Sequence, residues 1–452
     1  MDKKLNEYAI LMFIALSIYL LVGVIYSPPL EPLRDLLGIR DLPATRMTNE
    51  GYKLIPDNYE LFHLRTVHYY HGLFIGLISV SVILYYAITR RKPDLVLEII
   101  LFGGLITMAS AIIYGYITQT PIFHGLFIFG LSVVFTGGLF ILIKYSRTAL
   151  RTNSLLVAST LMLLIGGILG AVLGSYYMDP QASQEYISAV ISSRIDPDLA
   201  EDNILWRMRA GHEHGMLLSA LGLAAALLIQ KLNLSYNKAT RRLVDISSIS
   251  LAIASISSYL LVVFGGVVHK VITPASLLVI TALGLLGLYN AWRKRGFYNI
   301  TFTMGIILVW LFVAIPGALI AASLREPTSI INPAFRDPAW DYVELAYNIG
   351  HWHLLLMFWG VAILITASTI WPAEKTGKTI TLLSLIGLIL VGAGFNLYIL
   401  TNGPNPTNPY NNLWIRTLIE PGLTLTTLAT IMLGISIIKP ITNKNKSNPT
   451  KS

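Results

Sequence analysis

Nine histidines carry the clearest chemical signal in this sequence, because most of them lie inside long apolar segments. Eight occur near the starts of four such segments and one near the end of a fifth: His63, His68, His71, His124, His212, His214, His351 and His353, and then His269. Burying an imidazole costs free energy unless something binds it, and neutral imidazole is a common ligand of haem iron and copper. The pattern indicates haem or metal binding. The alternative is that these histidines hydrogen-bond water and head groups at helix ends.

The segment Gly350-His351-Trp352-His353 is the sharpest local motif. Residues two apart on an α-helix are rotated by about 200°. His351 and His353 therefore leave opposite sides of one helix and cannot readily share a metal ion. They suit two centres, one on each flank of the helix.

A second pair, His68 and His71, lies one turn apart and shares a helix face. Gly72 would let a flat macrocycle approach the backbone beside His71, although a small residue equally suits helix–helix packing. The five residues from His124 repeat the five from His71, 53 positions later. This spacing indicates either an internal repeat or a duplicated packing motif.

The segment Gly211–Gly215 contains His212 and His214, which must also diverge, so at most one is expected at a given metal. Glu213 between them is a candidate ligand or proton carrier. The alternative is a helix-start glutamate favoured by the helix dipole.

His269 ends a further apolar segment, 243–270, and is followed by Lys270. The two residues are either part of a metal site or an interfacial pair whose polar tips reach water. Tyr259 in the same segment is either a tyrosine donor or a packing residue.

The composition places the chain in a membrane. Of its 452 residues 54% are hydrophobic and 13% are charged, against about 25% charged residues in a soluble domain. The absence of cysteine excludes thiolate-bound iron–sulfur clusters, zinc–cysteine sites and covalent c-type haem attachment within this sequence.

Spanning the apolar core of a bilayer takes about 20 residues per helix. Continuous rather than alternating hydrophobicity favours helices over strands. The sequence predicts about twelve transmembrane helices: 8–26, 61–89, 94–118, 121–145, 152–176, 206–232, 243–270, 272–293, 300–322, 344–372, 378–400 and 412–438.

The basic residues predict the orientation of these helices. If the N-terminus is cytoplasmic and the chain alternates, 21 of the 33 lysines and arginines lie on the inner side. The positive-inside rule then predicts cytoplasmic N- and C-termini and a multi-pass protein of the cell (plasma) membrane. The net charge of +9 therefore reflects topology, and we expect lipid rather than nucleic acid as the surroundings. We expect an all-α protein with one transmembrane haem-binding domain, 1–442, and a disordered cytoplasmic tail, 443–452.

The motifs together resemble the catalytic subunit of the haem–copper oxidase superfamily, which includes C-type oxidases and nitric oxide reductases. The resemblance covers the whole chain in topology, and the segment Tyr347–His353 is its most specific motif. It implies that His351 binds a high-spin haem and that His353 binds a low-spin haem. It also implies that His71, or His68 in the reductase style, is the other low-spin ligand. The stretch from Trp206 to His212 resembles the motif whose histidine binds the second metal.

The sequence departs from the family where paired histidines normally hold copper or non-haem iron. Val267 and Val268 stand there instead, and His269 follows them. A metal bound by His212 and His269, with His214 or Glu213 recruited, is the arrangement that the remaining residues allow. Arg416 is a single arginine where the family has a pair near the haem propionates.

The resemblance implies a respiratory-chain oxidoreductase with two haems and copper or non-haem iron. In it, His351 and His212 are the catalytic residues, and oxygen or nitric oxide is reduced. Electrons would come from an outer-face cytochrome or cupredoxin subunit, or from quinol. A non-catalytic di-haem electron carrier that has lost the second metal is the alternative. A cofactor-free transporter also fits the hydropathy but leaves the histidines unexplained.

Overall fold

The computed structural model describes residues 2–25, 45–48, 51–54, 58–118, 120–177, 185, 204–318, 338–401 and 413–446. Most residues of the long links 27–60, 177–205 and 323–343 between the predicted helices, and residues 447–452 of the predicted tail, lie outside the described residues.

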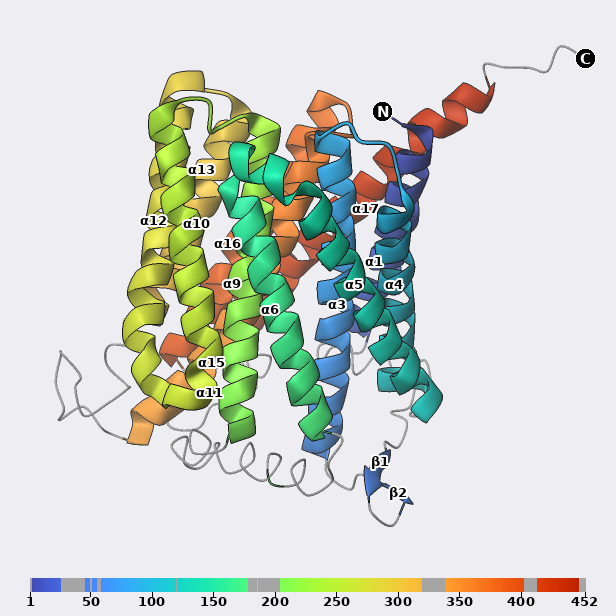
Figure 1. The fold of residues 1–452 in the computed structure, drawn as a ribbon, viewed down its shortest axis with the longest axis vertical. Coiled ribbons are helices and arrows are strands. Elements are labelled where there is room, and N and C mark those ends of the chain that lie inside the picture. The colour runs from blue at the N-terminus through green and yellow to red at the C-terminus, as the bar shows by residue number, and fades with distance from the viewer. Residues whose placement is uncertain are drawn as a thin grey trace, which may run out of the picture. The chain divides into compact units, whose positions relative to one another are not determined.

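The described chain is helical apart from one short hairpin (Figure 1). Strands β1 (Thr45–Thr48) and β2 (Gly51–Leu54) pair antiparallel, with Thr45 opposite Leu54. The helices are α1 (Lys3–Ile25), α3 (Asn58–Ile88), α4 (Leu95–Ile112) with the π-helical η2 (Ile113–Ile117), α5 (Pro121–Thr152), α6 (Ser154–Tyr177), α9 (Ile204–Leu232), α10 (Lys238–Tyr259), α11 (Leu261–Phe264), the 3-10 turn η3 (Gly265–Val268), α12 (His269–Lys294), α13 (Phe297–Val309) with the π-helical η4 (Trp310–Ala314), α15 (Pro338–Ser368), α16 (Glu374–Thr401) and α17 (Leu413–Lys446).

Ten of the described helices are long and apolar enough to cross a membrane. The chain is therefore an all-α, multi-pass membrane protein, as its composition predicts. The total of twelve spans and the side on which each terminus lies stay predictions. Helix α17 continues to Lys446, so it runs into the segment 443–452 that was expected to be disordered.

One difference from the predicted helix boundaries changes the position of a histidine. The segment expected as a single helix over 243–270 ends at Tyr259 and gives way to the short α11 and η3. Gly265 turns the chain there with φ +60° and ψ −155°, a conformation that is essentially restricted to glycine. His269 consequently opens α12, so the prediction that it ends the preceding helix is wrong.

The chain divides into two compact units, each described by itself. The first unit comprises Met1–Ile141, Ile363–Ser384 and Thr424–Ser452, and the second comprises Leu142–Ala362 and Leu385–Leu423.

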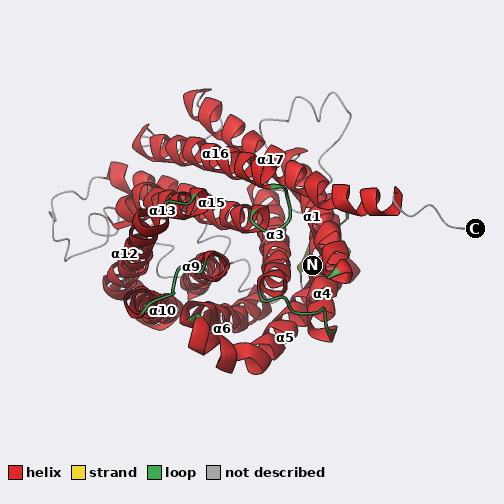
Figure 2. Ribbon diagram, turned by 90° about the horizontal axis from the view of Figure 1, so that it is seen from above, coloured by secondary structure: helices red, strands yellow, loops and turns green. Residues whose placement is uncertain are grey.

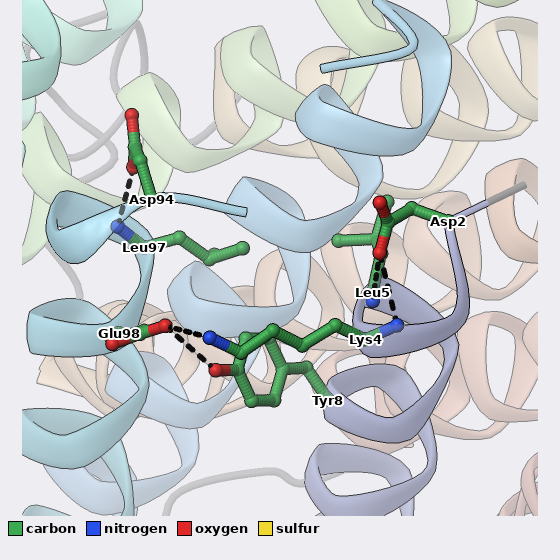
Figure 3. A network of polar contacts seen from close by, with 7 residues as sticks. All are labelled: Asp2, Lys4, Leu5, Tyr8, Asp94, Leu97 and Glu98. Carbon is green, nitrogen blue, oxygen red and sulfur yellow. Dashed lines mark hydrogen bonds and ion pairs between the residues drawn. The ribbon is translucent and has the colours of Figure 1, made fainter. Parts of the chain in front are cut away.

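In the first unit, α3 packs on α1 and α4. Polar contacts fix the starts of α1 and α4 to each other (Figure 3). The Lys4 ammonium and the Tyr8 hydroxyl both donate to the Glu98 carboxylate. Asp94 accepts from the backbone N–H of Leu97 at 3.2 Å and so caps the N-terminus of α4.

In the second unit, α9 is the interior helix. The six consecutive residues Ala224–Ile229 are all buried, which is expected of a helix surrounded by others. Figure 2 shows α9 enclosed by α6, α10, α12, α13 and α15. The position of α9 matters because its N-terminal half carries two of the histidines.

Candidate functional site

Three histidines from three helices come together in the second unit. The ring of His214 on α9 lies 6.4 Å from that of His269 on α12 and 6.1 Å from that of His351 on α15, measured between ring centres. The His214 and His269 rings are almost perpendicular, at 88°, and the His214 and His351 rings are inclined by 31°. His214 is therefore the shared member of the group, which we call the histidine trio.

The protonation of His214 follows from its neighbour. Its Nδ1 lies 2.8 Å from the carbonyl oxygen of Ala210, one turn earlier on α9. A carbonyl oxygen can only accept, so Nδ1 carries the proton and the lone pair is on Nε2. Metal-binding histidines commonly have this arrangement, because the second-shell acceptor fixes both the tautomer and the ring orientation.

His212 points to a different neighbour from His214, as their spacing predicts. It is 8% exposed, and its Nδ1 lies 2.9 Å from the carbonyl oxygen of Gly166 on α6. A Cβ built on Gly170, one turn further along α6, would lie 2.6 Å from the His212 ring. The structure thus brings His214, rather than His212, next to His269 and His351.

His353 leaves α15 on another side from His351, also as its spacing predicts. Its ring stacks on Phe395 of α16, with ring centres 5.1 Å apart and planes inclined by 28°. The side chains of Trp206 and Trp352 and of residues 347–350 lie outside the described part of the structure. These residues belong to the motifs Trp206–His212 and Tyr347–His353, so the surroundings of the two motifs are described only in part.

In the first unit, a second cluster joins His68 of α3 to His124 of α5. The two ring centres are 5.5 Å apart, and Tyr114 of the π-helical η2 packs against both rings, at 4.7 Å from His68 and 5.0 Å from His124. Phe127 packs between His68 and His71, at 4.9 and 6.1 Å. The repeat of the His71 motif at His124 did not predict this pairing, and no sequence motif marks Tyr114. The side chains of His63 and Arg65 lie outside the described residues.

His71 has the same tautomer as His214, because its Nδ1 lies 2.8 Å from the carbonyl oxygen of Val67. The adjacent Gly72 packs against a neighbouring helix. A Cβ at this position would lie 2.1 Å from the Tyr19 hydroxyl, which donates to the Tyr69 carbonyl at 2.8 Å. The structure therefore supports the packing interpretation of Gly72.

Glu213 pairs with a side chain of its own helix, α9. Its carboxylate pairs with the Arg209 guanidinium at 2.8 Å, and the two side chains are only 24% and 16% exposed. Glu213 is thus a half-buried member of an ion pair and not the solvated helix-start residue that was one of the two expectations.

Val267 and Val268, where the resemblance would place a histidine pair, differ in environment. Val267 is 57% exposed, whereas Val268 is 9% exposed and packs with Leu261 and Ile272. Ala210 of α9 packs against this apolar cluster. The cluster includes Val268, the residue directly before His269 in the chain.

The ring separations within the trio can be compared with those of two imidazoles that share one ion. Two imidazoles bound to one ion at about 2 Å from each nitrogen have ring centres roughly 5–6 Å apart. The separations within the trio are at or slightly above that range. Among the described residues, no three His, Asp or Glu side chains are grouped so as to hold a metal ion. Comparisons of the chain with protein-family models, curated proteins and solved structures found no match.

Proposed function

We propose that this chain is a haem-binding oxidoreductase subunit of the cell (plasma) membrane, similar to the catalytic subunit of the haem–copper oxidases. One observation carries the proposal, namely the convergence of His214, His269 and His351 from three separate helices. Three unrelated interfacial histidines, each hydrogen-bonding water at its own helix end, would have no reason to converge.

The residues of the trio have distinct proposed roles. His351 binds the iron of a high-spin haem, and His214 and His269 face the same region from α9 and α12. The Ala210 carbonyl holds the proton on Nδ1 of His214, which keeps the metal-binding lone pair on Nε2. The bound haem and a second metal would supply the electron transfer to a diatomic substrate.

The proposed reaction balances for either substrate. One dioxygen takes four electrons and four protons and gives two waters. Two nitric oxide molecules take two electrons and two protons and give nitrous oxide and one water. Electrons would arrive from an outer-face cytochrome or cupredoxin, or from quinol, within a respiratory complex.

The resemblance also leads us to propose His353 as one ligand of a low-spin haem, with His71 or His68 as the other. The tautomer of His71 supports its candidacy, because its lone pair is on Nε2. His68 packs against the rings of Tyr114 and His124, which favours His71 as the haem ligand.

A second candidate function is favoured by one distance. Ring centres roughly 6 Å apart suit two imidazoles bound on opposite sides of one iron, and His214 and His351 are 6.1 Å apart. An iron bound in this way has no position for oxygen or nitric oxide. The chain would then be a di-haem electron carrier, as the loss of the family's histidine pair also favours.

Carbon monoxide distinguishes the two candidates when wild type is compared with His214→Leu. If His214 serves a second metal, the reduced wild type binds carbon monoxide at the His351 haem, and His214→Leu lowers the content of the second metal. If His214 and His351 share one iron, carbon monoxide does not shift the absorption spectrum of the reduced wild type. It does shift the spectrum of reduced His214→Leu. The matched control is His212→Leu, which we expect to leave the spectrum unchanged because His212 faces α6.

Two outcomes would contradict these assignments. A spectrum that responds to His212→Leu and not to His214→Leu would return the metal-binding role to His212, as the family motif implies. A purified chain that contains no haem would exclude both candidates and leave the cofactor-free transporter.

A further inference from the structure

Two neighbouring links of the second unit carry a high density of positive charge. Seven basic residues lie between the end of α9 and the first turn of α10 and at the end of α12: Lys231, Lys238, Arg241, Arg242, Arg293, Lys294 and Arg295. The segments 231–245 and 289–299 contain one acidic residue, Asp245, whose carboxylate accepts a hydrogen bond from Ser154 at 2.6 Å. Seven positive charges against one negative charge leave an excess of six, which a bound anion would stabilise.

Side chains join the two links to each other. The Lys294 ammonium donates to the carbonyl oxygen of Asn233 at 2.8 Å and lies 4.5 Å from the centre of the Tyr236 ring. The Asn237 amide donates to the Tyr289 hydroxyl at 3.2 Å. Helices α10 and α12 also pack side by side (Figure 1). The positive charges of both links are therefore held together at one end of this helix pair.

The basic side chains at this end of the pair are exposed. We call the following residues the basic cluster: Lys238, Arg241, Arg242, Arg293, Lys294 and Arg295. The Arg293 guanidinium lies over the Tyr289 ring, 5.5 Å from its centre, which orients it without neutralising its charge. Within the described part of the chain, no carboxylate pairs with Arg242 or Arg295. Their charges are therefore available to a ligand from outside the chain.

Arg295 adopts a backbone conformation that favours glycine. It follows the last residue of α12 with φ +41° and ψ +25°, and its N–H donates to the carbonyl oxygen of Ala291. The left-handed region costs free energy for any residue with a Cβ. A non-glycine residue in such a position points to a role for its side chain. The positive charge also lies at the negative end of the α12 dipole.

Beyond the basic cluster, α12 presents an apolar ridge to the outside. Leu278, Leu285, Leu288 and Trp292 are between 48% and 79% exposed. At 100° per residue these four positions fall within one 80° sector of the helix. Trp292 ends the ridge directly before Arg293. Tryptophan is enriched at the level of the lipid head groups, so the end of this ridge is expected at the membrane surface.

Helix α10 presents a matching ridge. Its exposed residues are Ile246, Ile249, Ile253 and Ile256, at 40–63%, whereas the serines of the same helix are buried. Arg242 lies one turn before Ile246 and on the same face. Each of the two neighbouring helices therefore carries a stripe of large apolar side chains that ends at an exposed arginine.

We infer that the ends of α10 and α12 form a binding site for an anionic phospholipid. Arg242, Arg293 and Arg295 hold the phosphate of the head group, and the acyl chains lie along the two ridges beside Trp292. Basic clusters between transmembrane helices bind anionic head groups in this way. A free phosphate would use the arginines and leave the ridges without a role, which is why we assign a lipid.

The site is distinct from the histidine trio. His269 begins α12 and Arg293 lies in its last turn, so the two are about 35 Å apart along the helix. The inference therefore does not rest on the proposed function, and its test needs no haem.

Trp292 makes the site measurable by fluorescence, and Trp414 is the matched control because each is 79% exposed. The nearest arginine to Trp414 in the sequence, Arg416, pairs with Glu420. The full chain is placed in phosphatidylcholine that contains a small fraction of phosphatidylglycerol, with bromine, which quenches tryptophan, on the acyl chains of one lipid at a time. Comparison of the wild type with Trp292→Phe or Trp414→Phe gives the quenching of each tryptophan.

We expect brominated phosphatidylglycerol to quench Trp292 at least about threefold more than the same fraction of brominated phosphatidylcholine. Trp414 should respond equally to the two lipids. Replacing Arg242, Arg293 and Arg295 together by glutamine should remove the difference at Trp292. Replacing the same three arginines by lysine should keep most of it, because an ammonium also binds phosphate as a point charge.

The control variant Arg90→Gln/Lys92→Gln removes two exposed charges from the link before α4 and should leave the threefold difference unchanged. Thermal unfolding in phosphatidylcholine alone establishes that each variant is folded. Equal quenching of Trp292 by the two lipids would overturn the inference. So would a loss of the difference in Arg90→Gln/Lys92→Gln, which would indicate a general attraction to the surface. Displacement of the lipid by inorganic phosphate, beyond the effect of sodium chloride at equal ionic strength, would indicate a phosphate site without acyl-chain contacts and also overturn it.

Discussion

Single residues decide how the repeated His-Gly motif is interpreted. Gly72 and Gly125 occupy equivalent places in the two copies, but their surroundings differ. A Cβ on Gly72 would lie 2.1 Å from the Tyr19 hydroxyl, and Tyr19 is held by a stacked Tyr69 ring at 4.8 Å. A Cβ on Gly125 would meet no atom within 4 Å. The first glycine is thus needed for close packing, whereas the second is not.

We therefore expect Gly72→Ala to destabilise the protein by about 1–3 kcal/mol, because Tyr19 must move and gives up its bond to the Tyr69 carbonyl. Gly125→Ala is the matched control and should be neutral or stabilising by up to about 1 kcal/mol, since alanine favours the helix. Thermal unfolding of the purified variants measures both effects. An equal loss at the two positions would contradict the packing interpretation of Gly72.

The sequence predicted that neighbouring histidines leave their helix on different sides. It did not predict which residues of other helices each of them meets. The 3.6-residue period alone separates His212 from His214 and His351 from His353. Which neighbouring helix each of these histidines faces depends on how its own helix is rotated in the bundle. No local pattern encodes that rotation, so the family motif favoured His212, whereas the structure brings His214 to the trio.

At the level of elements, hydropathy located the helices because each needs a long apolar segment to cross the membrane. It did not locate the break between α10 and α12, since the residues from Leu260 to Val268 are themselves apolar. The alternation of serine and isoleucine in α10 was a readable signal of an inward polar face. The positions of the ionisable residues do not reveal it, because serine hydroxyls do not titrate.

The break at Gly265 sets where α12 begins and hence where His269 lies. With φ +60° and ψ −155°, alanine at this position is strained, and we expect Gly265→Ala to cost about 1–3 kcal/mol. Gly305→Ala in α13 is the control, because a Cβ there meets nothing within 4 Å. Thermal unfolding gives the cost, and the haem spectrum reports whether His269 has moved. A Gly265→Ala variant as stable as Gly305→Ala would mean that the turn tolerates a side chain.

At the level of the whole molecule, the distribution of basic residues predicts the orientation in the membrane. Lysines and arginines concentrate in links that alternate along the chain, and the positive-inside rule places those links in the cytoplasm. The link before α4 contains Lys92, whereas the link after η2 contains Thr120, and both side chains are exposed. The 23-residue span Leu95–Ile117 between them is about 35 Å long, enough to cross the bilayer.

The absence of cysteine makes that orientation directly measurable, because a single introduced thiol has no competitor. In intact cells, a membrane-impermeant maleimide should label Thr120→Cys and leave Lys92→Cys unlabelled until the membrane is permeabilised. Both substitutions are at exposed link positions, so neither should disturb a helix. The reverse pattern would invert the topology.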